Sequence, residues 1–277
     1  MNPLETKIAD HYGDAELLAR IDAGLETAGI DRNNLTPDDL APVEEFHIGG
    51  RMATEHLVSK MSLSDGDHVL DVGCGIGGAA RLIARQTGGR VTGIDLTPEY
   101  IETARILTER TGLADRVRLE IASALEMPFE DKSFDAAITI HVAMNIADRA
   151  ALYGEISRVL KPGATLALFD IMKKDDGALA YPVPWAVSDE TSHLTTPDEM
   201  LSFLKAAGFE VTEVEDRTAF ALDFFKQSFA AAKNGPPPLG VHLVLGAGAS
   251  EKLKNVFVNI ESGRIAPTLM IARRKPD

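Results

Sequence analysis

One stretch of the sequence decides how the rest of the chain is interpreted: Asp71-Val72-Gly73-Cys74-Gly75-Ile76-Gly77-Gly78. It follows a short apolar run that starts at His68, and it precedes a helix-like stretch at 79–86. Glycines at a turn from strand to helix let the backbone approach a ligand closely and point the free N–H groups of the helix at it. The stretch therefore predicts a strand, a ligand-binding loop and a helix in succession.

Short apolar segments and helical segments alternate outward from this loop. The predicted strands are 68–72, 90–95, 117–121, 134–140, 165–171 and 209–215. The predicted helices between them are 79–86, 149–159 and 197–207, with one more that starts at Thr97-Pro98. Such alternation predicts right-handed βαβ units and an α/β fold, whose doubly wound, mostly parallel sheet binds ligands at the carboxyl ends of its strands.

Further helical segments flank the alternating region on both sides. The expected N-terminal helices cover about 14–29, a segment that starts at the cap-like Thr36-Pro37, and 50–61. The expected C-terminal helices, 219–233 and 251–261, flank Pro236-Pro237-Pro238 and precede a last strand at 264–272. Gly29 is the expected terminator of the first helix. Pro267 favours an edge or strand-entry position for the last strand, because proline cannot donate to a ladder.

The composition fits an ordinary globular protein with an acidic surface. The 277 residues include 28 Lys+Arg and 42 Asp+Glu, a formal charge of −14, and 45% are hydrophobic. This charge disfavours nucleic acid and anionic membranes as partners. No apolar run is long enough to span a membrane, and no secretion signal is evident, so the expected location is cytoplasmic. The single cysteine, Cys74, excludes an internal disulfide and a multi-cysteine zinc site, and no metal site is expected.

The glycine loop is compatible with two ligand classes. Gly73-x-Gly75-x-x-Gly78 satisfies the dinucleotide fingerprint, whereas Asp71-x-Gly73-x-Gly75-x-Gly77 satisfies the form found in methyltransferases. Asp71 is unfavourable beside a pyrophosphate but favourable beside a ligand that carries an ammonium and a sulfonium. The alternative is that Asp71 only orders the loop by accepting backbone N–H groups. Asp95, at the end of the next strand, lies where an acid binds ribose hydroxyls in nucleotide-binding folds.

From about 45 to 215 the sequence resembles the class I S-adenosylmethionine-dependent methyltransferases of the type 11 group. Four ordered motifs carry the resemblance: Val69-Leu70-Asp71-Val72-Gly73-Cys74-Gly75-Ile76-Gly77, Gly93-Ile94-Asp95-Leu96-Thr97, Met127-Pro128-Phe129 before Ser133-Phe134-Asp135, and Arg158-Val159-Leu160-Lys161-Pro162-Gly163 before a strand that ends in Asp170. It implies a single domain with a seven-stranded Rossmann-like sheet. The expected parts are an N-terminal helical lid (1–62), a cofactor-binding core (63–216), a helical insertion on the acceptor side (217–263) and the last strand (264–277).

The resemblance also implies which residues hold the cofactor, S-adenosylmethionine, which becomes S-adenosylhomocysteine. Asp71 and the loop residues Gly73, Cys74, Gly75 and Gly77 would hold the methionyl part. Asp95 would bind the ribose and Leu96 would lie against the adenine. The family often has an acid for the adenine amino group where this chain has Ser123, so Ser123 and the backbone of Ala124 and Leu125 are the expected substitutes.

Residues of the expected acceptor side come from three further segments. His141, after the fourth strand, is a candidate base or orienting group that also borders the cofactor, and Asn145 is a candidate ligand of a polar acceptor or a cap of the next turn. In Phe46-His47-Ile48-Gly49-Gly50-Arg51, His47 is a candidate catalytic and substrate residue, and Arg51 is positioned to reach a carboxylate. Met144 and Trp185 are the other expected substrate contacts; an aromatic face can bind an ammonium. Each of these residues has a purely structural alternative.

A weaker similarity, to sarcosine/dimethylglycine N-methyltransferases, rests on His47-Ile48-Gly49-Gly50, Met144-Asn145-Ile146 and Phe169-Asp170-Ile171-Met172. We therefore expect methyl transfer to a small molecule, with an amine nitrogen favoured over oxygen, sulfur or carbon. The hypotheses from other classes are a nucleotide-dependent oxidoreductase and a cofactor-binding protein without catalysis. The expected partner is the small-molecule acceptor, and a homodimer is compatible with the sequence.

Overall fold

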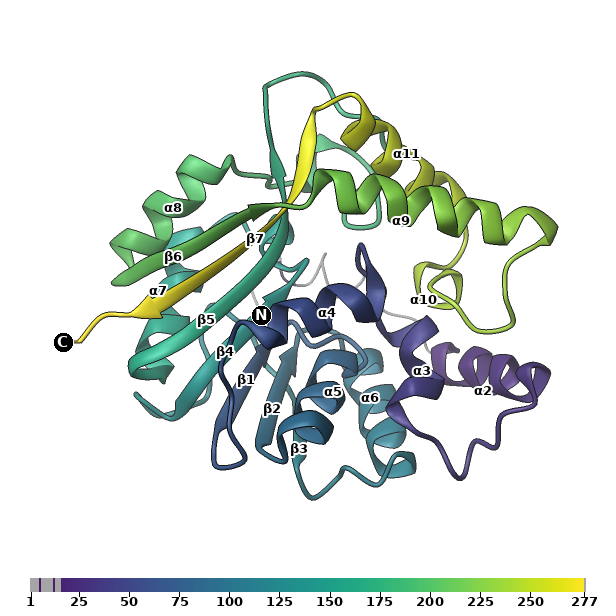
Figure 1. Ribbon diagram of the computed structural model, residues 1–277, viewed down its shortest axis with the longest axis horizontal. Coiled ribbons are helices and arrows are strands. Elements are labelled where there is room, and N and C mark those ends of the chain that lie inside the picture. Colours follow the sequence, from purple (N-terminus) through teal and green to yellow (C-terminus); the bar gives the residue numbers. More distant parts are fainter. Residues whose placement is uncertain (1–4, 6–11, 13–15, 277) are drawn as a thin grey trace.

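The fold is organised around one seven-stranded sheet, seen in a computed structural model that describes Glu5, Tyr12 and residues 16–276 (Figure 1). The strands are β1 (His68–Val72), β2 (Arg90–Asp95), β3 (Val117–Ile121), β4 (Phe134–Ile140), β5 (Leu160–Lys173), β6 (Phe209–Asp216) and β7 (Ile265–Arg274). Their order in the sheet is β3-β2-β1-β4-β5-β7-β6. The strands from β3 to β5 pair in parallel, and β7 is antiparallel to both of its neighbours. The predicted mostly parallel α/β sheet is confirmed.

The strand order reverses between β1 and β4, and this reversal fixes where a ligand can bind. Crossovers that leave β1 and β4 in opposite directions open a crevice at the carboxyl ends of the two strands. Buried residues alternate between the two faces along β1: Val69 belongs to one apolar core and Leu70 to the other. The sheet is therefore covered on both sides, as a parallel sheet must be.

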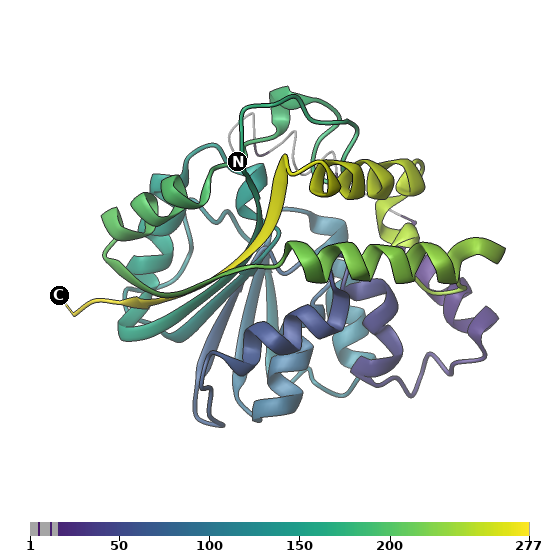
Figure 2. The same cartoon turned by 45° about the horizontal axis from the view of Figure 1, so that its top comes forward.

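Helices cover both faces of the sheet (Figures 1 and 2). The apolar core that includes Val69 also contains buried residues of α4 (Gly50–Ser59), α5 (Gly78–Thr87) and α6 (Pro98–Arg110). The core that includes Leu70 contains those of α7 (Arg149–Val159) and α8 (Pro197–Ala206). The remaining helices are α2 (Leu17–Ala28), α3 (Pro37–Glu44), α9 (Thr218–Ala231), α10 (His242–Leu245) and α11 (Ala249–Glu261).

Local signals account for most of the helix ends. Gly29 ends α2 with a φ of 71°, as predicted. Thr36 caps α3 in a reciprocal capping box with Asp39. The part of the predicted first helix at 14 and 15 lies outside the described residues. The short helix α10 follows the proline run and was not predicted.

Pro267 corrects one expectation about the last strand. β7 lies between β5 and β6 and is not an edge strand, so the edge alternative was wrong. Pro267 is the third residue of β7, and the ladder with β6 starts only at Thr268. The Pro267 carbonyl accepts instead from the Arg217 N–H, at 2.8 Å. Pro267 therefore lies beyond the end of β6, where its lack of an N–H removes no hydrogen bond with that strand. This position is the strand-entry alternative.

The N-terminal helix and the insertion before β7 meet above the sheet, although more than 200 residues separate them. The Arg20 guanidinium donates to the Leu243 carbonyl at 2.8 and 3.2 Å. A Cβ on Gly24 would lie 2.6 Å from the Pro238 carbonyl oxygen, so α2 approaches the insertion as closely as glycine permits. Figures 1 and 2 both show α9 and α11 beside each other, with α10 close to α2. No helix in the described part of the chain is both long and apolar enough to cross a membrane.

Candidate active site

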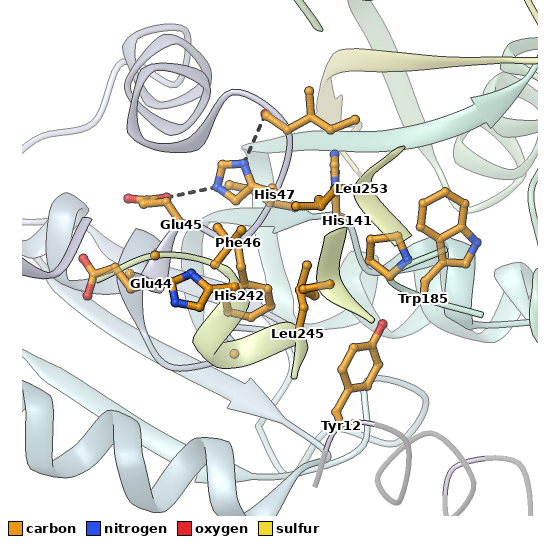
Figure 3. Close-up of a pocket in the computed structure, with 18 of the residues that line it drawn as sticks. Tyr12, Glu44, Glu45, Phe46, His47, His141, Trp185, His242, Leu245 and Leu253 are labelled. Carbon is orange, nitrogen blue, oxygen red and sulfur yellow. Dashed lines mark hydrogen bonds and ion pairs between the residues drawn. The ribbon is translucent and has the colours of Figure 1, made fainter. Parts of the chain in front are cut away.

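A cavity of about 780 Å³ lies at the carboxyl ends of β1, β2 and β4. Its walls come from the glycine loop, the segment before α4, the loop after β4, and the insertion (Figure 3). Of the residues expected at the site, the structure brings twelve to this cavity: His47, Asp71, Gly73, Cys74, Gly75, Asp95, Leu96, Ala124, His141, Met144, Asn145 and Trp185. Four are not among its lining residues: Arg51, Gly77, Ser123 and Leu125.

The glycine loop presents backbone to the cavity because side chains cannot fit there. Gly75 has a φ of 53°, and a Cβ on it would lie 2.6 Å from Cζ of Phe46. Gly73, with a φ of 73°, would place its Cβ against Val142. The N–H groups of Gly73 and Cys74 both donate to the Ile94 carbonyl, at 2.8 and 2.9 Å, which ties the loop to β2. The loop thus forms a preorganised cradle ahead of α5.

Asp71 carries an unused carboxylate oxygen in this cradle. Its side chain is 2% exposed, and Oδ2 has no hydrogen-bond partner in the structure. Burial raises the pKa of Asp71 to about 7, with contributions from Glu45 and Asp95. The backbone of Ala80 opposes this rise in the pKa of Asp71, so an interaction of Asp71 with the loop, the structural alternative, is compatible with a role toward a ligand. The unpaired oxygen fits a ligand cation such as an ammonium, because a buried carboxylate is costly without a partner.

Asp95 is held at the end of β2 by backbone donors. Thr97 N–H donates to Oδ1 at 2.9 Å, and Gly75 N–H donates to Oδ2 at 3.0 Å. Burial raises the pKa of Asp95, and these two hydrogen bonds oppose the rise. Each oxygen retains acceptor capacity toward the cavity, which suits a pair of ribose hydroxyls. Together with Asp71 and the loop, this donor and acceptor set fits S-adenosylmethionine.

Ser123 is occupied by a residue from the N-terminal part of the chain. Its hydroxyl is hydrogen-bonded to the Glu5 carboxylate and accepts the Leu125 N–H at 3.0 Å. Of the expected adenine contacts, Leu96 and Ala124 line the cavity, and Ser123 and Leu125 do not. Direct contacts of Ser123 and Leu125 with an adenine therefore remain predictions without support from this arrangement.

Arg51 is not among the lining residues of the cavity, and three acids engage it. Its guanidinium donates to Glu45 at 2.8 Å, to Glu44 at 3.1 Å, to Asp38 at 3.2 Å and to the Pro37 carbonyl at 2.8 Å. These bonds occupy its donors with protein groups. The structure therefore gives no support to a direct contact between Arg51 and a ligand carboxylate.

His141 faces the cavity with an unpaired ring nitrogen. Its φ of 54° is unusual for a residue with a side chain, and such strain is concentrated at functional sites. The His141 N–H donates to the Phe169 carbonyl at 2.7 Å, and the next N–H, of Val142, donates to Asp170 at 2.9 Å. Nε2 of His141 is buried without a partner. Burial, followed by the neighbouring His47, holds the pKa of His141 well below its usual value, so the ring is a neutral acceptor or donor.

His47 is placed beside His141 but is held by protein groups on both ring nitrogens. Nε2 lies 3.0 Å from Glu45 and 3.0 Å from the Thr54 hydroxyl, and Nδ1 lies 3.4 Å from the Ile48 carbonyl. The centroids of the two imidazole rings are 5.8 Å apart at 66°. Figure 3 shows the link from His47 to Glu45 and the position of His141 next to His47. This geometry suits His47 for orienting neighbours rather than for taking a proton.

The other expected acceptor contacts combine structural bonds with a place at the cavity. The Asn145 amide donates to the Val142 carbonyl at 3.3 Å, so it caps its own turn, and its Oδ1 accepts from the Tyr12 hydroxyl at 3.2 Å. Trp185 is 4% exposed and donates from Nε1 to the Ser192 hydroxyl at 2.9 Å. Met144 is buried in the same apolar cluster as Trp185. All three line the cavity, and none of the contacts excludes a role toward a ligand.

Several lining residues were not found by sequence reasoning. Tyr12 and Phe46 cover the cavity from the N-terminal side, and His242 and a set of aromatic residues reach it from the insertion. That set consists of Phe224, Phe225 and Phe229 on α9. The helical spacing of the phenylalanines in 220–229 was the one available signal. The spacing marks an apolar helix face, but it does not say what the face covers.

Comparison with known proteins agrees with this site. A family model described as a methyltransferase domain matches residues 70–168. An O-methyltransferase from Pyrenophora dematioidea is 30% identical over 77% of this chain and 79% of its own length. The methyltransferase GfsG from Streptomyces halstedii is 34% identical over 65% of each chain. The matches with the first relatives span between 45% and 68% of the lengths of those proteins, and the relatives include both O-methyltransferases and C-methyltransferases.

The solved structures extend the likeness of fold to the whole chain. The [4+2]-cyclase SpnF superposes with a TM-score of 0.73 at 23% identity, over 100% of this chain and 98% of its own. That likeness concerns the fold alone, since one fold serves different reactions. The relatives that match in sequence are methyltransferases, which overturns the dinucleotide interpretation of the glycine loop and with it the oxidoreductase hypothesis. The chain belongs to the S-adenosylmethionine-dependent class I methyltransferases.

Proposed function

We propose that this protein transfers a methyl group from S-adenosylmethionine to a hydroxyl oxygen of a small, largely apolar molecule. The observation that carries the proposal is His141, which lines the cavity beside the cofactor loop and whose buried Nε2 has no hydrogen-bond partner. A neutral imidazole at this place can accept a hydrogen bond from a hydroxyl and then its proton. A relative that shares 79% of its length with the chain is named an O-methyltransferase, which supports the same acceptor.

The part of the cavity formed by the loops after β4 and β5 and by the insertion is called the acceptor half, and the part formed by the glycine loop and the ends of β1, β2 and β3 is called the cofactor half. The walls of the acceptor half favour a largely apolar substrate. The residues there are chiefly aliphatic and aromatic and come from the loop after β4, the loop after β5 and the insertion: Met144, Ile146, Pro184, Trp185, Phe224, Phe225, Phe229, Leu239, Leu245, Leu253 and Val256. Polar side chains are fewer: Tyr12, Glu44, Glu45, His47, His141 and Asn145, with Ser228, His242 and Ser250 on the insertion. A pocket with apolar walls and a few polar groups binds a ligand by burial and orients it by hydrogen bonds.

The amine acceptor expected from the sequence is the second candidate. The aromatic face of Trp185 favours it, since such a face can bind a cation. Against it, the two carboxylates nearest to His47 are already engaged: Glu44 by Arg81 and Arg51, and Glu45 by Arg51 and Thr54. A protonated amine would also have to lose its proton before it could attack, because an ammonium has no free lone pair, whereas a hydroxyl can lose its proton as the carbon–oxygen bond forms.

The residues of the site would divide the work as follows. S-adenosylmethionine, when bound, supplies a methyl group on a positively charged sulfur. Asp71, Asp95 and the glycine loop would hold its ammonium, ribose and carboxylate-bearing parts. The apolar walls would exclude water and align the acceptor, a contribution of about 7–11 kcal/mol at best in well-oriented reactions. His141 would accept the hydroxyl proton as the new carbon–oxygen bond forms, and then release it to solvent.

A radiolabelled-methyl screen tests the proposal. The full chain is incubated with labelled S-adenosylmethionine and matched sets of hydroxylated aromatics, hydroxylated terpenoids, amines and thiols, and mass spectrometry locates the methyl in each product. Transfer chiefly to oxygen supports the proposal. Transfer chiefly to nitrogen or carbon contradicts the oxygen assignment, and cofactor binding without transfer to any class contradicts the enzymatic function.

A further inference from the structure

Two neighbouring buried acids lie between the cofactor half and the acceptor half of the cavity. Glu44 and Glu45, at the end of α3, have side chains that are 0% and 1% exposed. Arg51, the second residue of α4, spans both: Nη2 lies 3.1 Å from Glu44 and Nε lies 2.8 Å from Glu45. A planar guanidinium can bridge two carboxylates in a fixed geometry, which an ammonium cannot do.

Glu44 connects Arg51 to the glycine loop by way of Arg81. Arg81 of α5 is fully buried and donates from Nη2 to Glu44 at 2.5 Å and to the Ile76 carbonyl at 2.7 Å. Its Nη1 donates to the Thr108 hydroxyl of α6 at 2.9 Å. Ile76 lies in the glycine loop, so the loop accepts a hydrogen bond from Arg81 of α5, and the same guanidinium nitrogen is held by Glu44 of α3.

Glu45 connects Arg51 to His47, on the acceptor side of the cavity. Its Oε2 lies 3.0 Å from Nε2 of His47 and accepts from the Thr54 hydroxyl at 2.6 Å. His47 in turn sets the surroundings of His141, whose ring centroid is 5.8 Å away. The continuous order of contacts is Ile76 carbonyl, Arg81, Glu44, Arg51, Glu45 and His47.

We propose that Arg51 is a positioning residue for both halves of the site: through Glu44 and Arg81 it holds the cofactor loop, and through Glu45 it holds His47. This inference rests on the proposed function, because His47 matters only if the acceptor reacts beside it. Arg51 itself does not line the cavity, and of its hydrogen-bond partners only Glu44 and Glu45 do, so these two acids are the route from Arg51 to the site. Removing it would leave two adjacent buried carboxylates with one fewer cation, which is unfavourable in a low-dielectric interior.

The first test measures S-adenosylhomocysteine binding by calorimetry and methyl transfer by Arg51→Met. We expect a dissociation constant about tenfold higher, which corresponds to about 1.4 kcal/mol, together with a lower kcat at saturating cofactor. The matched control is Arg85→Met. Arg85 also joins α5 to α3, through Asp38 at 2.8 Å, an exposed acid that lies 3.2 Å from Arg51 as well. No ion pair links Arg85 to Glu44 or Glu45 among the described residues, and its side chain is 46% exposed. The control should bind S-adenosylhomocysteine and turn over as the wild type does.

Two further variants separate the contact of Arg51 with Glu44 from its contact with Glu45. Glu44→Gln should raise the dissociation constant of S-adenosylhomocysteine more than it lowers kcat, and Glu45→Gln should do the reverse. In the double variant Glu44→Gln with Arg51→Met, the loss of cofactor affinity should not exceed the loss in Arg51→Met alone, because both changes break one path. If Arg51 only stabilised the fold, these variants would lower the free energy of unfolding without separating the loss of cofactor affinity from the loss of kcat.

The inference is overturned if Arg51→Met retains wild-type affinity and kcat, or if Arg51→Met and Arg85→Met lose the same amount. Additive losses in the double variant overturn it as well. If Arg51→Met does not fold, Arg51→Lys is measured in its place. An ammonium cannot bridge the two carboxylates in the fixed geometry of a guanidinium, so we expect Arg51→Lys to retain either the cofactor affinity or the kcat of the wild type, but not both. Failure of the proposed function shows separately, as absence of methyl transfer by the wild type, and the calorimetric results on Arg51, Arg85 and Glu44 stand without any acceptor.

Discussion

The cofactor half and the acceptor half of the cavity are built in different ways. The cofactor half comes from the ends of β1, β2 and β3, within about 55 consecutive residues from Asp71 to Ala124. The acceptor half joins Tyr12, the loops after β4 and β5, and the insertion that reaches from α9 to α11. The first half depends on backbone geometry that short motifs dictate. The second depends on how distant segments pack, which no short motif specifies.

The two halves also differ in electrostatics. The cofactor half contains two buried carboxylates, Asp71 and Asp95, whose pKa values are both raised by burial. The acceptor half contains a neutral His141 and apolar walls. A cationic ligand is therefore favoured on one side and an apolar one on the other. The comparison predicts that substitutions in one half change one binding event and leave the other nearly intact.

The largest expected effect belongs to His141→Ala. Loss of a proton acceptor in contact with the substrate should lower kcat by about 10²–10⁴-fold, with S-adenosylhomocysteine affinity close to that of the wild type. His141→Asn is the control for backbone strain, because asparagine tolerates positive φ better than alanine. Radiometric turnover and calorimetry are the measurements. Wild-type turnover in either variant would reduce His141 to a packing residue.

The next effect concerns the cofactor half. Asp95→Ala should weaken S-adenosylhomocysteine binding by about 1–3 kcal/mol, because charged hydrogen bonds to the ribose are lost. The kcat at saturating cofactor should change much less than in His141→Ala. Calorimetry gives the affinity, and adenine alone, which lacks the ribose, serves as the control ligand. Unchanged affinity would show that Asp95 does not bind the ribose.

The pH dependence of cofactor binding gives a third, smaller effect. Asp71 has a pKa of about 7, and only its charged form, which prevails above that pH, pairs with a ligand ammonium. S-adenosylhomocysteine affinity should therefore rise by about tenfold between pH 6 and pH 8. Asp71→Asn should bind more weakly and show a flatter profile. A wild-type profile that stays flat or falls as the pH rises would contradict the pairing.

The smallest effect concerns the contact between α2 and the insertion. In Gly24→Ala the new Cβ would lie 2.6 Å from the Pro238 carbonyl oxygen, and such overpacking costs about 1–3 kcal/mol. The gain in helix propensity offsets about 0.5–1 kcal/mol of that cost. The free energy of unfolding in urea should fall, and acceptor binding should weaken more than cofactor binding.

Gly154→Ala is the matched control for this contact. Gly154 also lies inside a helix, α7, but a Cβ there would meet nothing within 4 Å. This variant should gain stability by about 0.5–1 kcal/mol from helix propensity. Equal effects of the two substitutions on stability would show that α2 and the insertion do not depend on close approach at Gly24.

Residues that follow strands were predictable, and residues that depend on partners from elsewhere were not. Asp71, Asp95 and His141 were identified because the carboxyl ends of parallel strands meet at one edge. Arg51 was expected to bind a ligand, because the sequence does not reveal that Glu44 and Glu45 accept hydrogen bonds from it. Ser123 was assigned to the adenine, whereas its hydroxyl is hydrogen-bonded to Glu5, 118 residues away.

By itself the sequence determined the alternating strands and helices, the glycine cradle and the acids beside it, because each of these rests on contiguous residues with fixed spacing. Only the tertiary structure decided that Arg51 serves two buried acids and that Tyr12 meets Asn145. It also decided that an apolar insertion closes the acceptor half. Such contacts form between segments far apart in the chain, and the free energy that selects them comes from burial of side chains whose partners the local sequence does not name.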